Sequence, residues 1–447
     1  MQTKKNKAGY EMMLLPSLES FIPEDHNLRL LNKVLDLNFV HDAVRTRYCQ
    51  SNGRPSIDPE VVMRLFLIQA IEGIVHVREL MRQVQVNLAY RWFIGYGLDE
   101  KLPDHSTLSK ALDRIGDEIF NELFERSIIQ CRESGLIGGR VLHIDATTIR
   151  ADLDRDRVET PDSPDPDARY GHFPDGKLRP GYKQHTVVDE KRRVVVGLDV
   201  SPANEHEHDY AVGVLDKALR HSGFHPEAVC ADAAYGSGDN RKALEKRGIR
   251  FVSPPPKVAT TKRGSYFTTE DFEYDEIKDI FICPTGSVLK YVGRVTDRPN
   301  QRRYAGSQNV CRICELRHRC TRSSRRQLKV GSNHAALRRL RLDSHTDSFK
   351  ELYRSRAPVV EGIFAEAKQW HGLRRAWRRG LSKMRIQCLL IAAVLNFKRL
   401  VNLANTLFMS FMMPKNIIRV VFKIIIRIQH EISKIPKSQI ITACCLR

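Results

Sequence analysis

The chain has 447 residues, a formal net charge of +20 and a pI near 9.6. Hydrophobic residues make up 42% of it, which excludes a disordered chain and leaves room for roughly two to four domains. The excess of positive charge favours a polyanionic partner, nucleic acid first and an anionic membrane surface second, over a merely basic soluble protein.

Residues 1–136 are expected to form a helical N-terminal domain. Asp58 and Pro59 are a typical N-cap and first helical residue for a helix over 60–72, and further helices are expected over 77–93, 107–115 and 117–134. Short basic helices joined by tight turns suit either a helix-turn-helix-like DNA contact or a packing and dimerisation domain.

Residues 137–256 alternate strand and helix signals. Strands are expected over 141–144, 184–189, 193–200, 228–232 and 250–253, with helices over 209–222 and 239–247 and a loop over 151–180. The order of these elements predicts an α/β fold with a ribonuclease-H-like mixed sheet and flanking helices.

Residues 257–347 read as a basic insertion that interrupts this fold, and helices return over 348–404, which we assign to the C-terminal part of the same fold. The tail, 405–447, differs in composition, because its apolar stretch 416–432 carries a basic residue at every fourth position. The tail is either a membrane-surface or partner helix or an accidental extension, for example through a shifted reading frame.

Three acids stand where a pair of divalent cations would need ligands. Asp145 and Asp232 each follow an apolar run that reads as a strand, and Glu361 lies in a helical stretch. Each acid taken alone is more often structural, but carboxylates converging from two strand ends and a helix are typical of sites that hold two Mg²⁺ or Mn²⁺ ions for phosphoryl transfer. Most other acids, among them Glu366, are expected to face solvent, and Glu366 is the nearest alternative should Glu361 be misassigned.

The segments around these acids, 143–147, 231–236 and 360–368, resemble the three motifs of insertion-sequence DDE transposases. Four N-terminal stretches, 53–56, 78–80, 90–95 and 103–107, are similar to the helical domain that precedes the catalytic core in one large bacterial group. The resemblance spans about residues 10–400. It implies a ribonuclease-H-like core, Mg²⁺-dependent cleavage at element ends and strand transfer into target DNA.

The family's third motif also carries a Tyr, an Arg and a Lys, to which Tyr353, Arg356 and Lys368 correspond in type. Arg356 is one residue farther upstream than the usual spacing and Pro358 intervenes, so its implied phosphate contact is less secure than that of Lys368. Lys368 lies two helical turns beyond Glu361 on the same face, either gripping a phosphate or solvated.

The chain has ten cysteines. Four of them are isolated in apolar or helical stretches and look like buried free thiols, namely Cys49, Cys131, Cys230 and Cys388. Six others remain. Four of them lie in the insertion, namely Cys283, Cys311, Cys314 and Cys320. A C-x₂-C pair with two more thiols predicts a structural Zn²⁺ site, with His318 as a substitute ligand, against the alternative of unrelated free thiols.

Basic residues cluster after the cysteines, over 317–341, and again around Trp377, where they are Arg374, Arg375, Arg378 and Arg379. Such density favours DNA phosphate contact over a solvated face, because it adjoins the third acidic motif. Trp370 and Trp377 are expected to pack in the core rather than to stack on a displaced base.

We therefore expect a DNA transposase that acts on element ends and target DNA, as a homodimer or higher synaptic complex. A decayed transposase that only binds DNA and a ribonuclease-H-like nuclease are the alternatives. Because the sequence shows no secretory signal and no run of about 20 uncharged apolar residues, we expect no membrane partner and a location in the bacterial cytoplasm at the nucleoid.

Overall fold

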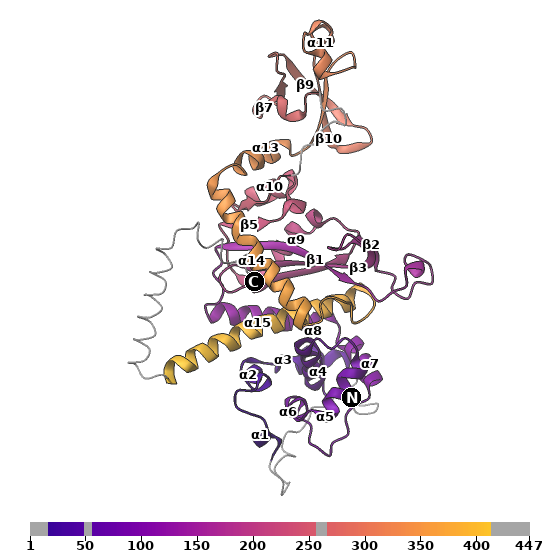
Figure 1. The fold of residues 1–447 in the computed structure, drawn as a ribbon, viewed down its shortest axis with the longest axis vertical. Coiled ribbons are helices and arrows are strands. Elements are labelled where there is room, and N and C mark those ends of the chain that lie inside the picture. The colour runs from indigo at the N-terminus through magenta and orange to yellow at the C-terminus, as the bar shows by residue number, and fades with distance from the viewer. Residues whose placement is uncertain (1–16, 49–55, 256–265, 413–447) are drawn as a thin grey trace, which may run out of the picture.

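The computed structural model describes residues 17–48, 56–255 and 266–412, so the basic stripe predicted over 416–432 lies outside the described residues. Three parts follow one another from bottom to top of Figure 1: a group of short helices, an α/β core, and a lobe built by the insertion. In the described part of the chain, a narrow neck around residues 332–346 joins the lobe to the core (Figure 1).

The N-terminal region is all helical. Its α-helices are α1 (Leu18–Phe21), α2 (Asn27–Val34), α3 (Phe39–Ala43), α4 (Pro59–Glu72), α5 (Val77–Val86), α6 (Leu88–Ile94), α7 (His105–Ile115) and α8 (Asp117–Glu133). Asp58 caps α4 as predicted, accepting a 2.8 Å hydrogen bond from the Glu60 amide. The apolar residues of α4 are buried almost all round, so this helix forms the centre of the region.

The single helix predicted over 77–93 is wrong, because the chain breaks at Asn87 into α5 and α6. Asn87 has an extended ψ of 115°, and its side chain accepts hydrogen bonds from the amides of Ala89 and Tyr90. An Asn side chain that bonds to the backbone in this way starts a new helix instead of continuing the old one.

The core is a mixed sheet built on one long strand. Its strands are β1 (Val141–Arg150), β2 (Arg169–His172), β3 (Leu178–Asp189), β4 (Val194–Pro202), β5 (Ala228–Ala231) and β6 (Arg250–Val252). β1 is antiparallel to β3 and parallel to β5, β5 is parallel to β6, and β3 pairs antiparallel with β4 and β2. This is the predicted ribonuclease-H-like sheet, although β2 falls in the expected loop.

Four helices cover the sheet. They are α9 (Ala211–Ser222), α10 (Gly238–Glu245), α14 (Asp347–Trp370) and α15 (Leu381–Met412). α14 leaves the neck and crosses β6, β5 and β1, whereas α9 packs on β3 and β4 (Figure 1). The helices expected over 348–404 are thus α14 and α15, which are joined by the loop over 371–380.

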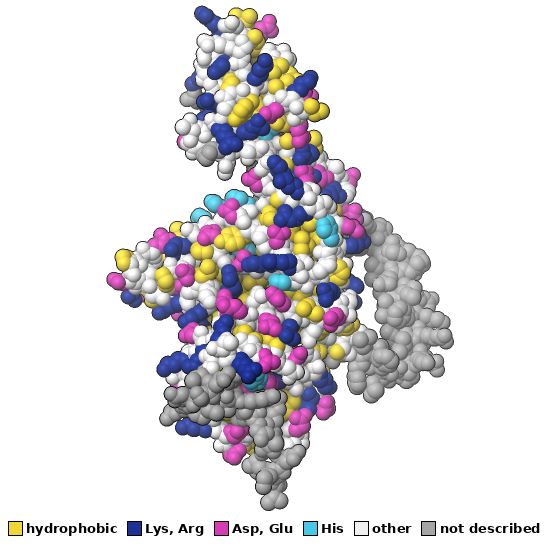
Figure 2. Space-filling view, turned by 180° about the vertical axis from the view of Figure 1, so that it is seen from behind, with side chains coloured by type: hydrophobic (Ala, Val, Ile, Leu, Met, Phe, Trp, Pro, Cys, Tyr) yellow, Lys and Arg dark blue, Asp and Glu magenta, His cyan; other side chains and the backbone are white. Residues whose placement is uncertain are grey.

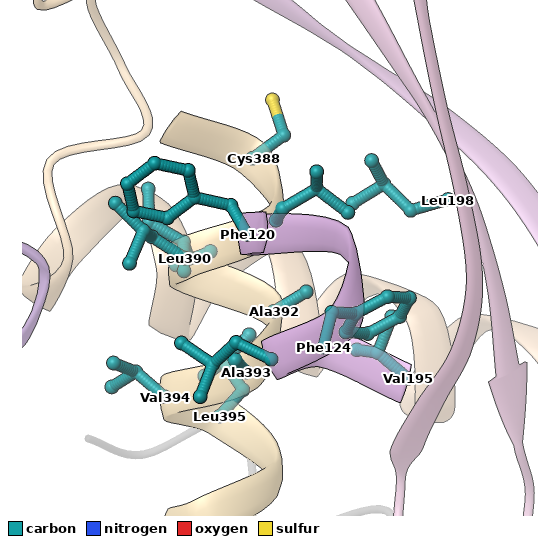
Figure 3. Packing of buried hydrophobic residues seen from close by; sticks show 14 of the residues in the cluster. Phe120, Phe124, Val195, Leu198, Cys388, Leu390, Ala392, Ala393, Val394 and Leu395 are labelled. Atoms are coloured by element: carbon teal, nitrogen blue, oxygen red, sulfur yellow. The ribbon is translucent and has the colours of Figure 1, made fainter. Parts of the chain in front are cut away.

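α15 carries the longest apolar surface of the described chain. Its stretch Leu381–Ala404 is long and apolar enough to cross a membrane, yet 72% of its most apolar window is buried inside the protein. Figure 3 shows this surface packed against Phe120 and Phe124 of α8 and Val195 of β4. We therefore interpret α15 as the helix that joins the N-terminal region to the core.

One buried polar residue fixes this junction. Asn396, fully buried on α15, donates to Val195 O (2.9 Å) and Ser127 Oγ (3.0 Å) and accepts from Val195 N (2.9 Å). Replacing Asn396 by Ala would remove the Asn396 hydrogen bonds of Val195 N and Val195 O and leave Ser127 Oγ with only its bond to the Phe124 carbonyl, which costs about 2–3 kcal/mol of the free energy of unfolding. Urea unfolding measures this loss, and the exposed Asn402 on the same helix gives the control substitution, Asn402→Ala, for which little change is expected.

The insertion forms a β-rich lobe, which its sparse apolar pattern did not predict. Its strands are β7 (Glu273–Asp275), β8 (Ile280–Ile282), β9 (Val288–Val295), β10 (Arg298–Ala305) and β11 (Gln327–Gly331), with helices α11 (Gln308–Ile313), α12 (Arg317–Cys320) and α13 (His334–Asp343). The five strands pair antiparallel in order of sequence and enclose a small apolar core of their own. Lys and Arg side chains are scattered over the face of the lobe and the neck seen in Figure 2.

Candidate active site

Asp145 and Asp232 lie side by side because β1 and β5 run parallel in a fixed register. Ile144 stands opposite Ala231, so the next residue of each strand comes to the same place in the sheet. The predicted strand end at Asp145 is wrong: β1 continues to Arg150 because its second half pairs with β3, which leaves Asp145 in the middle of a strand. Only Asp232 stands at a strand end.

The backbone after β5 holds Asp232 in place. Its Oδ1 accepts a 3.0 Å hydrogen bond from the Ala234 amide and caps the short turn Ala233–Tyr235. The Ser253 hydroxyl, just beyond β6, donates to the Asp232 carbonyl at 2.6 Å. Sequence reasoning did not identify Ser253, although its position directly after a strand beside β5 was a usable signal.

Burial makes the charge of Asp145 costly. The side chain is 16% exposed, and its pKa rises to about 6 because burial and the neighbouring Asp232 raise it more than Arg356 and the Ala146 amide lower it. Two adjacent carboxylates with one arginine are left short of positive charge, and hard divalent cations prefer such oxygen ligands. The donor set at this point therefore fits a divalent cation.

Arg356 ties α14 to β1 through Asp145. Its guanidinium donates to Asp145 Oδ2 at 2.9 Å, with a side chain 13% exposed, and lies 5.7 Å from the ring centre of Tyr353. Tyr353 stacks in turn on Phe349, 6.3 Å away between ring centres. The phosphate contact predicted for Arg356 would thus require it to leave Asp145, and Tyr353 lies half-buried beside it.

Glu361 lies on α14, the helix that crosses β5 and β1, but it is not next to the two aspartates. A helix turns about 140° net over the five residues from Arg356 to Glu361, and the Glu361 side chain is exposed. Within residues 17–48, 56–255 and 266–412, no three His, Cys, Asp or Glu side chains are arranged to hold a metal ion. The structure therefore brings Asp145 and Asp232 together, and the metal-ligand role of Glu361 stays a prediction.

Glu366, the nearest alternative to Glu361, has a different role. Its carboxylate pairs with Lys398 at 2.5 Å and Arg399 at 2.6 Å, both on α15. Burial raises the pKa of Glu366, but the hydrogen bonds and charges of Lys398 and Arg399 lower it by more. The resulting pKa is about 2. Glu366 thus joins α14 to α15 rather than facing solvent as expected.

Replacing Glu366 by Gln should lower the free energy of unfolding at neutral pH by about 2–3 kcal/mol. Because the folded pKa lies below the ordinary value of 4.5, this stabilisation is fully present above pH 4.5 and disappears as the pH falls towards 2. Urea unfolding between pH 3.5 and pH 7 measures the trend. An equal loss in Glu351→Gln, an exposed acid on the same helix, would contradict the assignment.

The predicted basic residues after α14 divide into two groups. Arg374, Arg375 and Arg379 are exposed, and the backbone at Arg374 and Ala376 hydrogen-bonds to Arg150 at the end of β1, at 3.2 and 2.8 Å. This pairing places exposed arginines beside the end of β1, where Arg375 donates a hydrogen bond to Asp152.

Arg378 instead packs inward. Its guanidinium lies 5.0 Å from the ring centre of Phe66 in α4, and burial lowers its pKa to about 10. Lys368 is half-buried at the end of α14, where burial and then Arg374 lower its pKa. Trp370, expected in the core, is 61% exposed, which contradicts that expectation.

A buried aromatic network that sequence reasoning missed lies behind the two aspartates. Tyr235, fully buried three residues after Asp232, shares a 3.4 Å hydrogen bond with His185, which also bonds to Ser201 at 3.0 Å. The His185 ring stacks on Tyr210 with centres 4.2 Å apart, and burial lowers the pKa of His185 to about 4. A neutral, fully bonded His185 is suited to holding the turn after Asp232 rigid.

The four insertion cysteines also come together. Cys283, Cys311, Cys314 and Cys320 all line one cavity of about 240 Å³ in the lobe. His318 is exposed and its Nδ1 lies 3.0 Å from the Glu315 carbonyl, away from the residues that line the cavity. The strands β1 and β5 lie in the α/β core, whereas the cavity lies in the lobe.

Comparison with known proteins matches most of the chain to two family models. Residues 16–114 match a model described as Transposase domain (DUF772), and residues 137–397 match one described as Transposase DDE domain. No curated protein matches the chain.

Among solved structures, the chain is similar to a piggyBac transposase synaptic complex with hairpin DNA, at 11% identity and a TM-score of 0.33, covering 86% of this chain and 80% of that one. It is also similar to a Mos1 transposase paired-end complex with left transposon end, at 14% identity and a TM-score of 0.17, covering 46% and 61%. At this distance the assignment depends on the two family models.

Proposed function

Because the chain belongs to the DDE transposase family, whose domain model spans residues 137–397, we propose that it cuts DNA at the ends of an insertion sequence and joins the freed ends to target DNA with divalent cations. The observation that carries this proposal is the adjacent pair Asp145 and Asp232 on parallel strands inside that domain. The pair supplies the oxygen ligands for which the family's chemistry calls.

In this proposal some residues of the protein bind the cations and others keep those residues in position. Asp145 and Asp232 hold the cations, and Glu361 is the proposed third carboxylate, on a helix that Arg356 already fastens to β1. Two Mg²⁺ or Mn²⁺ ions, when bound, activate the attacking oxygen and neutralise the leaving one. The buried network behind Tyr235 keeps the aspartates in position.

DNA is the proposed partner on both sides of the reaction. The exposed Arg374 and Arg375 lie where β1 ends, Arg379 follows in the same loop, and Lys368 lies in the last turn of α14. Their charges suit phosphate contacts that fix the DNA strand without reading its sequence. Because two element ends must be cut and inserted together, we expect a homodimer or higher synaptic complex, acting in the bacterial cytoplasm at the nucleoid.

The test uses purified full-length protein and labelled DNA that carries the repeats flanking the gene. With Mg²⁺, we expect nicks at the element ends and products covalently joined to a target plasmid, and neither in EDTA. Cutting without any joining would instead favour a ribonuclease-H-like nuclease. Binding without cutting would favour a decayed transposase that only occupies DNA, and either outcome overturns the proposal.

The double substitution Arg374→Ala and Arg379→Ala should weaken binding to element-end DNA and flatten its salt dependence. Each lost phosphate contact lowers the slope of log K against log salt by about 0.9, so a decrease of about 2 is expected. Filter binding from low to high salt measures it. Arg220→Ala, at an exposed position on α9, is the control and should leave the slope unchanged.

A further inference from the structure

We infer that the insertion lobe binds one structural Zn²⁺ through Cys283, Cys311, Cys314 and Cys320, apart from the catalytic aspartates. All four residues line the same cavity of about 240 Å³, and each is a free thiol. Four thiolates around one ion are a common closed, tetrahedral zinc site.

The Cys283 turn is already shaped to present a thiolate. Cys283 follows β8, and the turn closes through hydrogen bonds from the Cys283 amide to the Ser287 carbonyl (2.9 Å) and from the Gly286 amide to the Cys283 carbonyl (2.8 Å). Gly286 has a φ of 81°, which suits glycine. The Ser287 amide also donates to Cys283 Sγ at 3.3 Å.

The Thr285 hydroxyl lies 3.1 Å from the same Cys283 sulfur. The turn thus directs two polar groups at the Cys283 thiol, which lines the cavity together with the other three cysteines.

The other three ligands come from a segment with little apolar attachment, in which Cys320 packs partly buried against the core of the lobe. Cys311 lies on α11, Cys314 directly follows it, and Cys320 ends α12. Neither α11 nor α12 buries a single residue, and the core of the lobe has only six buried hydrophobic side chains. So small a core benefits from a metal that fastens these helices to the sheet.

No three of the described side chains are close enough to hold an ion, so binding must draw the sulfurs inward to about 2.3 Å from the zinc. The cavity provides the space for this movement. Once closed, the site would also fix the exposed Arg312, Arg319 and Arg322 of the same segment.

Full-length protein, purified without chelator, should contain about one zinc per chain by atomic emission. Four of its thiols should react with a thiol reagent only after a chelator is added. Cobalt added to the stripped protein should give the visible spectrum of a tetrahedral thiolate site. Protein that takes up neither metal, or whose four thiols react at once, would overturn the inference.

Variants identify the ligands. The double substitution Cys311→Ser and Cys314→Ser should abolish zinc binding and leave helix content unchanged, because the lobe has a core separate from that of the catalytic domain. Cys131→Ala, a thiol of α8 outside the cavity, should keep the metal. If His318→Ala lost the zinc, the four-thiolate ligand set would be wrong. Reversible chelation of the wild-type protein, followed by limited proteolysis within the lobe, gives the same information should the double variant fail to fold.

Discussion

Replacing Asp145 by Asn should reduce cleavage at element ends by at least about 1,000-fold, because an amide is a poor ligand where the reaction needs a charged oxygen. Asp145 has a side chain that is 16% exposed and sits in the middle of the long central strand. Single-turnover cleavage of labelled ends measures the loss. Asp216→Asn, on α9 and paired with Arg247, is the matched acid-to-amide control and should cleave normally.

The same substitution should not unfold the protein. The folded pKa of Asp145, about 6, exceeds the ordinary 3.8, so in the metal-free protein its charge opposes folding at neutral pH. That penalty disappears as the pH falls from about 6 to about 4. The Asp145→Asn variant should therefore be at least as stable as wild type at pH 7.5 without metal, and a large fall in its melting temperature would show that lost cleavage reflects misfolding.

Replacing Glu361 by Gln should reduce cleavage by at least about 100-fold with no change in melting temperature, because the side chain is exposed and supports no packing. Glu366→Gln provides the comparison, since its carboxylate is bonded to Lys398 and Arg399. We expect that variant to lose stability and to keep cleavage in whatever fraction stays folded. Full cleavage by Glu361→Gln would remove Glu361 from the catalytic set.

The strand part of the site was readable from sequence because it depends on local pattern. Apolar runs that end in Asp145 and Asp232 predicted two strands, and parallel pairing then brings the two acids together. The local pattern does not show, however, which strand pairs with which. β1 reaches Arg150 because β3 lies beside it, so the strand expected over 141–144 stopped short of polar residues such as Thr147.

The helical part was less readable because it depends on rotation about a helix axis. Spacing placed Glu361 and Glu366 on one helix but did not show which of them faces α15. The partners that decide this, Lys398 and Arg399, lie more than thirty positions further along the chain. The same limit applies to Arg378, whose contact with Phe66 in α4 no local pattern indicates.

The insertion shows the third limit. Its cysteine spacing predicted a cluster, and the four thiols do line one cavity. Its sheet was missed because the strands are short and basic residues interrupt their apolar positions, as Arg302 and Arg303 do in β10. The spacing of cysteines can still be recognised among basic residues, whereas the hydrophobic periodicity that predicts strands cannot.

Strand transfer by pre-cut element ends tests the central claim most directly, because it isolates the joining step at Asp145 and Asp232. Full-length protein is incubated with ends that carry a free 3′-hydroxyl, a target plasmid and Mg²⁺. We expect covalently joined products from the wild-type protein and none from Asp145→Asn or in EDTA. Joined products that persist in the folded Asp145→Asn variant, or a wild-type protein that cuts ends but never joins them, would contradict the account.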